Sequence, residues 1–251
     1  MFSERERERY KRQMMLFGDE GQERLKKAHI FIAGAGGLGS PVSLYLAVAG
    51  VGTITIVDMD RVDQTNLNRQ ILHFDRDIGK KKTASAEEKL QEINPDITIH
   101  AIDAKIDETN ATKLVGRADG IVDAMDNYPT RYLLNEVAIA KEIPLFHGGI
   151  HGFYGQATTI IPGTTPCPKC IFPKPPPQEV FPVVGVTAGI IGTVQTNEVL
   201  KYLLGIGELL TGRLFIWDGM QAHAEEICVE CNPACEACGG MAKKTSAREK
   251  K

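Results

Sequence analysis

A glycine-rich segment, Gly34-Ala35-Gly36-Gly37-Leu38-Gly39, could bind the phosphates of a nucleotide. Gly34 permits a tight turn, Gly36 lets the backbone approach a phosphate, and Gly39 permits close packing of a helix on a sheet. The N-terminus of the following helix offers free N–H groups and a positive dipole end. Asp58, about 20 residues on, is placed to bind a ribose hydroxyl. The pattern does not indicate which nucleotide binds. The alternative is a purely structural glycine turn that binds no ligand.

The stretch after Asp58 is rich in charged and amide side chains. A reaction that releases pyrophosphate needs positive charge, whereas hydride transfer needs little beyond the pyrophosphate region. A solvated helix start is the alternative explanation for the lysines alone. Together these side chains favour a triphosphate over NAD, and they are Asp60, Asn66, Arg69, Lys80, Lys81 and Lys82.

Two further carboxylates, Asp123 and Asp126, lie at or just beyond the carboxyl end of an expected strand. Ligands of open α/β sheets bind at that edge. A carboxylate there could hold Mg²⁺, which accompanies ATP. The alternative is helix capping, because Asp-Asn followed by Tyr-Pro-Thr-Arg is good helix-start chemistry. The two explanations are evenly balanced for Asp123, and we favour function for Asp126.

The segments that carry these residues have the sequence patterns of strands and helices in alternation. Such an alternation predicts a mostly parallel sheet covered by helices on both faces, a Rossmann-like α/β fold. The later elements read as an antiparallel extension of the same sheet. Expected helices span residues 5–15, 21–28, 38–49, 80–93, 131–141 and 187–204, and expected strands span 29–33, 53–57, 97–101, 120–124, 144–147, 154–161, 214–217 and 222–227.

The six cysteines form three C-x-x-C pairs, Cys167/Cys170, Cys228/Cys231 and Cys235/Cys238. A disulfide framework would scatter its cysteines more widely, and a reducing compartment would not keep it. Four thiolates from two such pairs make a closed tetrahedral zinc site, so the sequence predicts structural zinc. The first pair supplies one half, and the two later pairs compete for the other half.

The composition and the charge limit which classes of protein this chain can belong to. With 43% hydrophobic residues, the 251-residue chain can bury a substantial core, and its formal net charge of −3 predicts no bulk attraction to nucleic acid. The charged N-terminus is unlike a signal peptide, and no apolar run reaches the length of a membrane span. We therefore expect a cytoplasmic protein without a membrane partner.

The order of motifs resembles the HesA/MoeB/ThiF family, the relatives of ubiquitin-activating enzymes, over residues 9–240. The motifs are RYKRQ, GAGGLG, DMD, NLNRQ, GKKKT, DAMDN, CPKC and NPACEACG. The resemblance implies one adenylation domain over residues 1–240, with an N-terminal helical arm and a disordered tail at 241–251. It also implies an ATP-dependent adenylyltransferase that activates the C-terminal glycine of a ubiquitin-like sulfur carrier ending in Gly-Gly, in molybdopterin or thiamine biosynthesis.

The resemblance assigns roles to individual residues. The glycine loop, Gly37 above all, would meet the phosphates of ATP and Asp58 the ribose. Asn66, Arg69 and Lys82 would contact phosphates, and Asp126 would hold Mg²⁺. Arg12 would reach the active site of the other subunit, which requires a homodimer. The residues expected to be catalytic are Arg12, Arg69, Lys82 and Asp126, and those expected to bind the nucleotide are Gly34, Gly36, Gly37, Gly39, Asp58, Asp60, Asn66, Arg69, Lys82 and Asp126.

For the zinc site, the resemblance selects Cys235 and Cys238 as partners of Cys167 and Cys170. Cys228 and Cys231 are then bystanders, a redox pair or a second thiol site. Many relatives carry a further cysteine in the crossover loop, and here none occurs between Cys170 and Cys228. That departure puts a covalent transfer step in doubt but leaves adenylation intact. Other interpretations are an NAD-dependent oxidoreductase, adenylation of a peptide or a tRNA base, and a non-catalytic zinc-bearing scaffold for ubiquitin-like proteins.

Overall fold

The computed structural model describes residues 2–174 and 182–239. Its eight strands form one sheet in the order β3-β2-β1-β4-β5-β6-β7-β8. The strands are β1 His29–Ala33, β2 Thr53–Asp58, β3 Thr98–Asp103, β4 Gly120–Asp123, β5 Leu145–His151, β6 Tyr154–Ile160, β7 Arg213–Asp218 and β8 His223–Cys228. The helices are α1 Glu4–Lys27, α2 Gly39–Ala49, α3 Lys82–Ile93, α4 Ala111–Val115, α5 Tyr128–Lys141, α6 Pro168–Ile171 and α7 Gly185–Leu204, with 3₁₀ turns η1 Gln64–Asn66 and η2 Asp75–Asp77.

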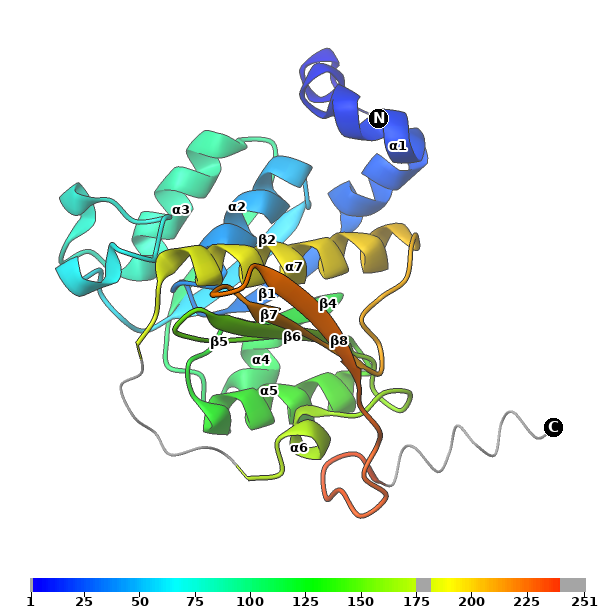
Figure 1. Cartoon of the computed structure of the whole chain (residues 1–251). Coiled ribbons are helices and arrows are strands. Elements are labelled where there is room, and N and C mark those ends of the chain that lie inside the picture. Colours follow the sequence, from blue (N-terminus) through cyan, green and yellow to red (C-terminus); the bar gives the residue numbers. More distant parts are fainter. Residues whose placement is uncertain (1, 175–181, 240–251) are drawn as a thin grey trace.

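The first five strands are parallel, and the order in which strands are added to the sheet reverses between β1 and β4. β1 pairs with β2 on one side and with β4 on the other. Four of the five residues of β1 and all four of β4 are buried, because helices cover both faces. The connections that follow β1 and β4 lead to α2 and α5 on opposite faces of the sheet (Figure 1), and open α/β sheets bind ligands at such a switch point.

Helices lie on both faces of the sheet, as predicted. α1, α2, α3 and α7 lie on one side and α4, α5 and α6 on the other (Figure 1). One cluster of buried apolar side chains joins the sheet to the first group of helices. A second cluster joins it to α4 and α5 and includes three cysteines of the C-terminal half. The chain therefore has two apolar layers around one sheet.

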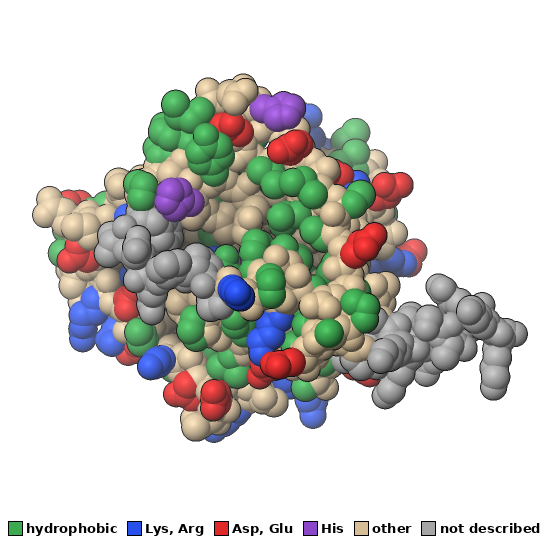
Figure 2. Space-filling view, turned by 60° about the horizontal axis from the view of Figure 1, so that its bottom comes forward, with side chains coloured by type: hydrophobic (Ala, Val, Ile, Leu, Met, Phe, Trp, Pro, Cys, Tyr) green, Lys and Arg blue, Asp and Glu red, His purple; other side chains and the backbone are tan. Residues whose placement is uncertain are grey.

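The last three strands are antiparallel and extend the same sheet. β6 pairs with β5 and β7, and β8 forms the outer edge. α7 packs against β5 and β6, but every residue of β8 is exposed. On the face drawn in Figure 2, hydrophobic side chains gather around a hollow. The predicted Rossmann-like fold with an antiparallel C-terminal part is confirmed.

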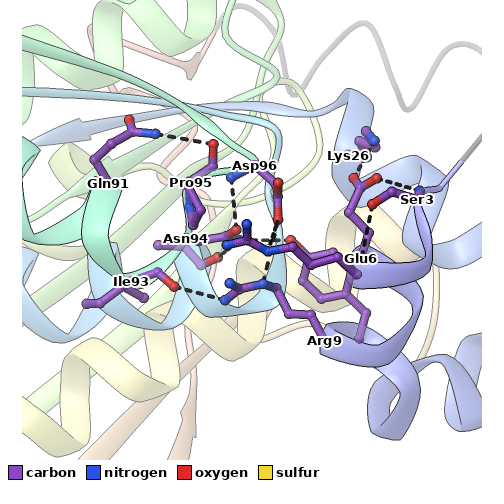
Figure 3. A network of polar contacts seen from close by, with 12 residues as sticks. Ser3, Glu6, Arg9, Lys26, Gln91, Ile93, Asn94, Pro95 and Asp96 are labelled. Carbon is purple, nitrogen blue, oxygen red and sulfur yellow. Dashed lines mark hydrogen bonds and ion pairs between the residues drawn. The ribbon is translucent and has the colours of Figure 1, made fainter.

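The N-terminal arm is one helix with a break at Gly18, where φ is 68° and ψ is −176°. The two predicted helices therefore lie on either side of that break. The Arg9 guanidinium donates to the carbonyl of Ile93 (2.9 Å) and lies 3.7 Å from the Asp96 carboxylate. The buried amide of Asn94 donates to the hydroxyl of Tyr10 (2.8 Å). These contacts fix the first half of the arm to the end of α3 (Figure 3).

Some boundaries differ from the sequence predictions. α4 and α6 were not expected, because five and four residues are too few to show a helical period. α5 begins at Tyr128 because the Asn127 side chain caps it by accepting from the Thr130 N–H (3.0 Å). The expected disordered tail at 241–251 lies outside the described residues. No helix of the described chain is long and apolar enough to cross a membrane.

Candidate active site

A cavity of about 1090 Å³ opens at the carboxyl ends of the parallel strands. That volume is enough for a nucleotide and part of a second substrate. Its walls come from the glycine loop after β1, the end of β2, the start of α3, the β3–α4 loop, the β4–α5 loop and Ile150 of β5. Eight of the predicted site residues line it: Gly34, Gly36, Gly37, Asp58, Asp60, Arg69, Lys82 and Asp126.

The glycine loop is shaped by two positions where a side chain would not fit. Gly34 has a φ of 101°, and a Cβ there would lie 2.8 Å from the carbonyl oxygen of Ala124. A Cβ on Gly39 would lie 1.9 Å from the carbonyl oxygen of Gly34. Among the described residues, no group accepts a hydrogen bond from the N–H of Gly36 or Gly37. Both glycines line the cavity, so the loop presents free donors suited to an anion.

Asp58, Asp60 and Lys82 form a linked charged group at the end of β2. The Asp58 carboxylate accepts from the N–H of Ala35 (2.8 Å) and from the N–H of Asp60 (2.8 Å). The ammonium of Lys82, which is 5% exposed, lies 2.8 Å from Asp60 Oδ2 and 4.0 Å from Asp58 Oδ1. The lysine is thus held as a fixed cation between the loop and α3. The solvated helix start considered for the lysines describes the exposed Lys80 and, in part, the half-buried Lys81, but not Lys82.

Of the two motif residues Arg69 and Asn66, only Arg69 lines the cavity. The Arg69 guanidinium lines the cavity and donates to the Thr65 carbonyl (2.9 Å) and to Asn68 Oδ1 (2.9 Å). Asn66 does not line the cavity. Its side-chain oxygen accepts from the Asp63 N–H (3.2 Å) and so closes the 3₁₀ turn η1. Asn66 therefore shapes the segment that delivers Arg69, and the structure does not bring it to the site directly.

The two carboxylates of the β4–α5 region have separate surroundings. Asp126 is exposed and lines the cavity. Asp123 is fully buried and accepts from His147 Nδ1 (2.7 Å). Burial acts to raise the pKa of Asp123, but the Arg131 cation and the His147 hydrogen bond outweigh it and lower that pKa. Asp123 is thus a structural anion, and Asp126 is the carboxylate open to a metal ion.

Sequence reasoning missed other residues of the cavity wall. Arg131 lines it, and its guanidinium donates to the Met125 carbonyl and lies 3.8 Å from Asp123. The β3–α4 loop adds a wall through Lys105, Ile106 and Asp107. Ligands of open α/β sheets bind at the carboxyl ends of the strands, and this rule could have indicated the loop after β3.

Arg12 lies outside this cavity. It is an exposed residue of α1, before the break at Gly18, and its side chain makes no hydrogen bond or ion pair with the described part of the chain. The cavity of one chain is therefore built without Arg12.

A second site is formed by cysteines. Cys167, Cys170, Cys235 and Cys238 place their sulfur atoms within 4.8 Å of one another. Individual Sγ–Sγ distances are 3.8, 3.7 and 3.3 Å. A tetrahedral zinc ion with bonds of about 2.3 Å requires sulfur atoms about 3.8 Å apart, so this cluster can hold a metal ion. The Asn232 N–H donates to Cys170 Sγ (3.4 Å), which supports a thiolate.

The middle cysteine pair, Cys228 and Cys231, lies outside the four-thiol cluster. Cys228 is exposed at the end of β8, and Cys231 is partly buried. Burial raises the pKa of the Cys231 thiol, with smaller contributions from Cys170 and Cys235. The geometry therefore joins the first and last pairs, which is the pairing that the family resemblance selected.

Comparisons with known proteins agree with this geometry. The model of the ThiF family matches residues 10–237. The chain belongs to the ThiF family. It is 42% identical over 240 residues to the SAMP-activating enzyme E1 of Haloferax volcanii, covering 92% of this chain and 88% of that protein. It is 42% identical over 251 residues to the sulfur carrier protein adenylyltransferase of Thermus thermophilus, covering 95% and 93% of the two chains.

Solved structures show the same fold. MccB of E. coli in complex with N-formylated MccA superposes with a TM-score of 0.84, at 22% identity, over 92% of this chain and 75% of that chain. PaaA superposes with a TM-score of 0.79, at 26% identity, over 91% and 75%. The family expected from the sequence motifs is confirmed.

Proposed function

We propose that this ThiF-family chain is an ATP-dependent adenylyltransferase that activates the C-terminal glycine of a ubiquitin-like sulfur carrier. One observation carries the proposal: a single cavity brings together the free glycine-loop amides, Lys82, Arg69 and Asp126. The relatives named as a sulfur carrier protein adenylyltransferase and a SAMP-activating enzyme E1 support the same chemistry. A hydride-transfer enzyme would not need this concentration of charge at the phosphate end.

The reaction needs placement and charge neutralisation more than proton transfer. The acceptor carboxylate is ionised at neutral pH, so no general base is required. One carboxylate oxygen bonds to the α-phosphorus of ATP, the bond from that phosphorus to the bridging oxygen breaks, and pyrophosphate leaves. Arg69 and Lys82 would neutralise the charge that builds on the phosphates, and Asp58 would bind the ribose. Asp126 would hold Mg²⁺, which would supply further positive charge to the phosphates.

The acceptor would enter from the antiparallel side. Beyond Asp126 the cavity continues to Ile150 and Val183. The neighbouring β5–β6 turn exposes Phe153 and Tyr154, and the edge strand β8 exposes Ile227. Apolar surface of this kind suits a folded carrier whose extended C-terminus runs into the cavity. A free peptide is the second acceptor class, since the MccB neighbours were solved with MccA.

Three assignments complete the proposal. The four-cysteine cluster would hold a structural zinc ion, because four converging thiols are a donor set that zinc prefers. Residues 1–240 would form one adenylation domain, which the single eight-stranded sheet supports. The protein would act as a homodimer in which Arg12 of each α1 arm reaches the other subunit's cavity, and the exposure of Arg12 supports this role.

Carrier-dependent ATP–pyrophosphate exchange tests the central proposal. The purified protein, ATP and Mg²⁺ are mixed with ubiquitin-like proteins that end in Gly-Gly and with peptides that end in Gly. We expect exchange with a carrier, and a loss of about 100-fold or more in Asp126→Asn. Asp75→Asn, which removes an exposed carboxylate outside the cavity, serves as the control and should keep full activity. Exchange with peptides alone would replace the carrier by a peptide acceptor.

Mixing two inactive variants tests the dimer. Arg12→Ala and Asp126→Asn would each be inactive as pure homodimers. After subunit exchange, half of the dimers would be mixed and would carry one intact site, which should restore about a quarter of the wild-type rate. No recovery, with subunit exchange verified by mass spectrometry, would place Arg12 outside the partner's site.

A further inference from the structure

A chain of buried polar groups connects the back of the glycine loop to an ion pair beneath α3. His73 Nε2 lies 2.9 Å from the carbonyl oxygen of Ala35, and its Nδ1 lies 2.9 Å from Ser85 Oγ. Ser85 Oγ lies 2.9 Å from the ammonium of Lys89, which lies 2.5 Å from the carboxylate of Asp77. All four of these side chains are at most 5% exposed. Burying polar groups costs free energy unless they are paired, so a buried chain of this kind indicates a role beyond packing in the apolar core.

The donors and acceptors run in one direction along this chain. The Ala35 carbonyl can only accept, so the single proton of the neutral imidazole lies on Nε2 and is donated to that carbonyl. His73 Nδ1 is then an acceptor, and it accepts from the Ser85 hydroxyl, whose oxygen accepts in turn from the Lys89 ammonium. Burial lowers the pKa of His73, and the nearby lysine cations lower it further, so the imidazole is neutral at neutral pH. The network therefore fixes one tautomer of His73.

That tautomer determines the direction of a loop peptide. In a trans peptide the C=O and the following N–H point in opposite directions. Because the Ala35 carbonyl is drawn toward His73, the N–H of Gly36 is turned the opposite way. Gly36 lines the cavity, and no group of the described chain accepts from its N–H. The preceding peptide is held separately, since the Ala35 N–H donates to Asp58.

We propose, given the proposed nucleotide function of this cavity, that His73 is a positioning residue that presents the Gly36 N–H to a phosphate of the bound nucleotide. His73 is not among the residues that line the cavity, so it acts through the loop and not by touching the ligand. Its partners on α3 fix its tautomer, and the loop is thereby arranged before the nucleotide arrives. Such preorganisation removes an ordering cost from binding.

Two substitutions at residue 73 separate positioning from packing. In His73→Gln, the amide nitrogen can still donate to the Ala35 carbonyl, and the amide oxygen can accept from Ser85. In His73→Leu, an apolar side chain fills the space but offers no hydrogen bond. The matched control is His29→Leu, because His29 Nε2 makes one hydrogen bond to Thr55 (2.8 Å) at the opposite end of β1. Ser85→Ala is a milder variant, for use if His73→Leu does not fold.

The experiment measures the Kd of ATP by calorimetry without an acceptor, and amide hydrogen exchange of the peptide that covers residues 34–40. We expect His73→Leu to weaken ATP binding roughly tenfold and to speed exchange in the loop, because one hydrogen bond and the loop order are lost. His73→Gln should stay within about threefold of wild type, as a retained hydrogen bond implies, and Ser85→Ala should weaken binding about threefold. His29→Leu should change neither measurement.

Two results would overturn the positioning role: unchanged Kd and loop exchange in folded His73→Leu, or a His73→Gln variant as weak as His73→Leu. A wild-type protein that binds no ATP would instead refute the proposed function. The loop exchange of the two His73 variants would then decide by itself whether His73 orders the loop.

Discussion

The two halves of the sheet differ in how their polar and apolar groups are held. In the parallel half, β1 and β4 are almost fully buried, and even some charged side chains nearby, Lys82, Lys89 and Asp77, are enclosed. In the antiparallel half, every residue of β8 is exposed. The nucleotide end is therefore fixed before any ligand binds. The antiparallel half also exposes apolar side chains, among them Phe153, Tyr154 and Ile227, which a second macromolecule could cover.

The cysteine cluster should matter most, because it joins the two halves. Three of its members belong to the apolar layer that contains α4 and α5. Cys235→Ser should remove about one zinc ion per chain and lower the free energy of unfolding by about 4 kcal/mol or more, since structural zinc supplies folding energy directly. Elemental analysis and denaturant unfolding measure the two effects.

Cys228→Ser is the matched control for that cysteine, because Cys228 is exposed and lies outside the cluster. It should leave both zinc content and stability unchanged. Equal loss of zinc in the two variants would mean that the C-terminal pairs share the metal.

Within the parallel half, Lys89→Met should destabilise the protein by about 3 kcal/mol. The substitution leaves the fully buried Asp77 without its nearest cation, and an uncompensated buried charge is costly. Lys80→Met removes a cation 3.5 Å from the same carboxylate, but Lys80 is exposed. That control should cost about 1 kcal/mol or less. Similar losses in urea unfolding for both variants would contradict the distinction between enclosed and exposed charges.

The same carboxylate predicts a pH dependence. Burial acts to raise the pKa of Asp77, but the Lys89 hydrogen bond and the Phe74 N–H outweigh it and lower the pKa from 3.8 to about 2. A depressed pKa stabilises the fold above pH 3.8, and the contribution is lost as the pH falls toward 2. The stability difference between wild type and Asp77→Asn should therefore shrink by about 2 kcal/mol between pH 5 and pH 2. A constant difference across that range, measured by urea unfolding, would rule out the shift.

The smallest effect is expected at the outer edge of the sheet. Ile227→Ala on β8 should change stability by about 0.5 kcal/mol or less, because Ile227 is already 46% exposed. The same substitution at the fully buried Ile56 of β2 should cost about 3 kcal/mol. A large thermal destabilisation from Ile227→Ala would show that β8 is not the open edge described here.

The sequence predicted the strands of the parallel half well, and β1 residue by residue, because buried strands are apolar runs bounded by glycine and polar residues. It also indicated most of the cavity, since the glycine loop, Asp58, Lys82 and Asp126 lie in short contiguous motifs. Lys82 could be separated from Lys80 and Lys81 only in three dimensions, where Asp60 and Asp58 hold it.

The residues that the sequence did not indicate depend on partners that only the folded chain brings into contact. His73 gains its role from Ala35, 38 residues away, and from Ser85. Arg131 meets Asp123 and Met125 across the β4–α5 loop. No local spacing marks such pairs, because only the folded sheet edge brings them together. Asn66 shows the opposite case, since it lies three residues before Arg69 in the same motif, but its side chain closes a turn and does not line the cavity.

The most direct measurement follows the α-phosphate of ATP. The protein is incubated with Mg²⁺, a ubiquitin-like carrier ending in Gly-Gly and ATP labelled at either the α- or the γ-phosphate, and the carrier is analysed by mass spectrometry. We predict that the α-label and the mass of AMP move to the carrier's C-terminus, that the γ-label leaves in pyrophosphate, and that Asp126→Asn abolishes both. Transfer of the γ-label, or ATP binding without any adenylated carrier or peptide, would contradict the account.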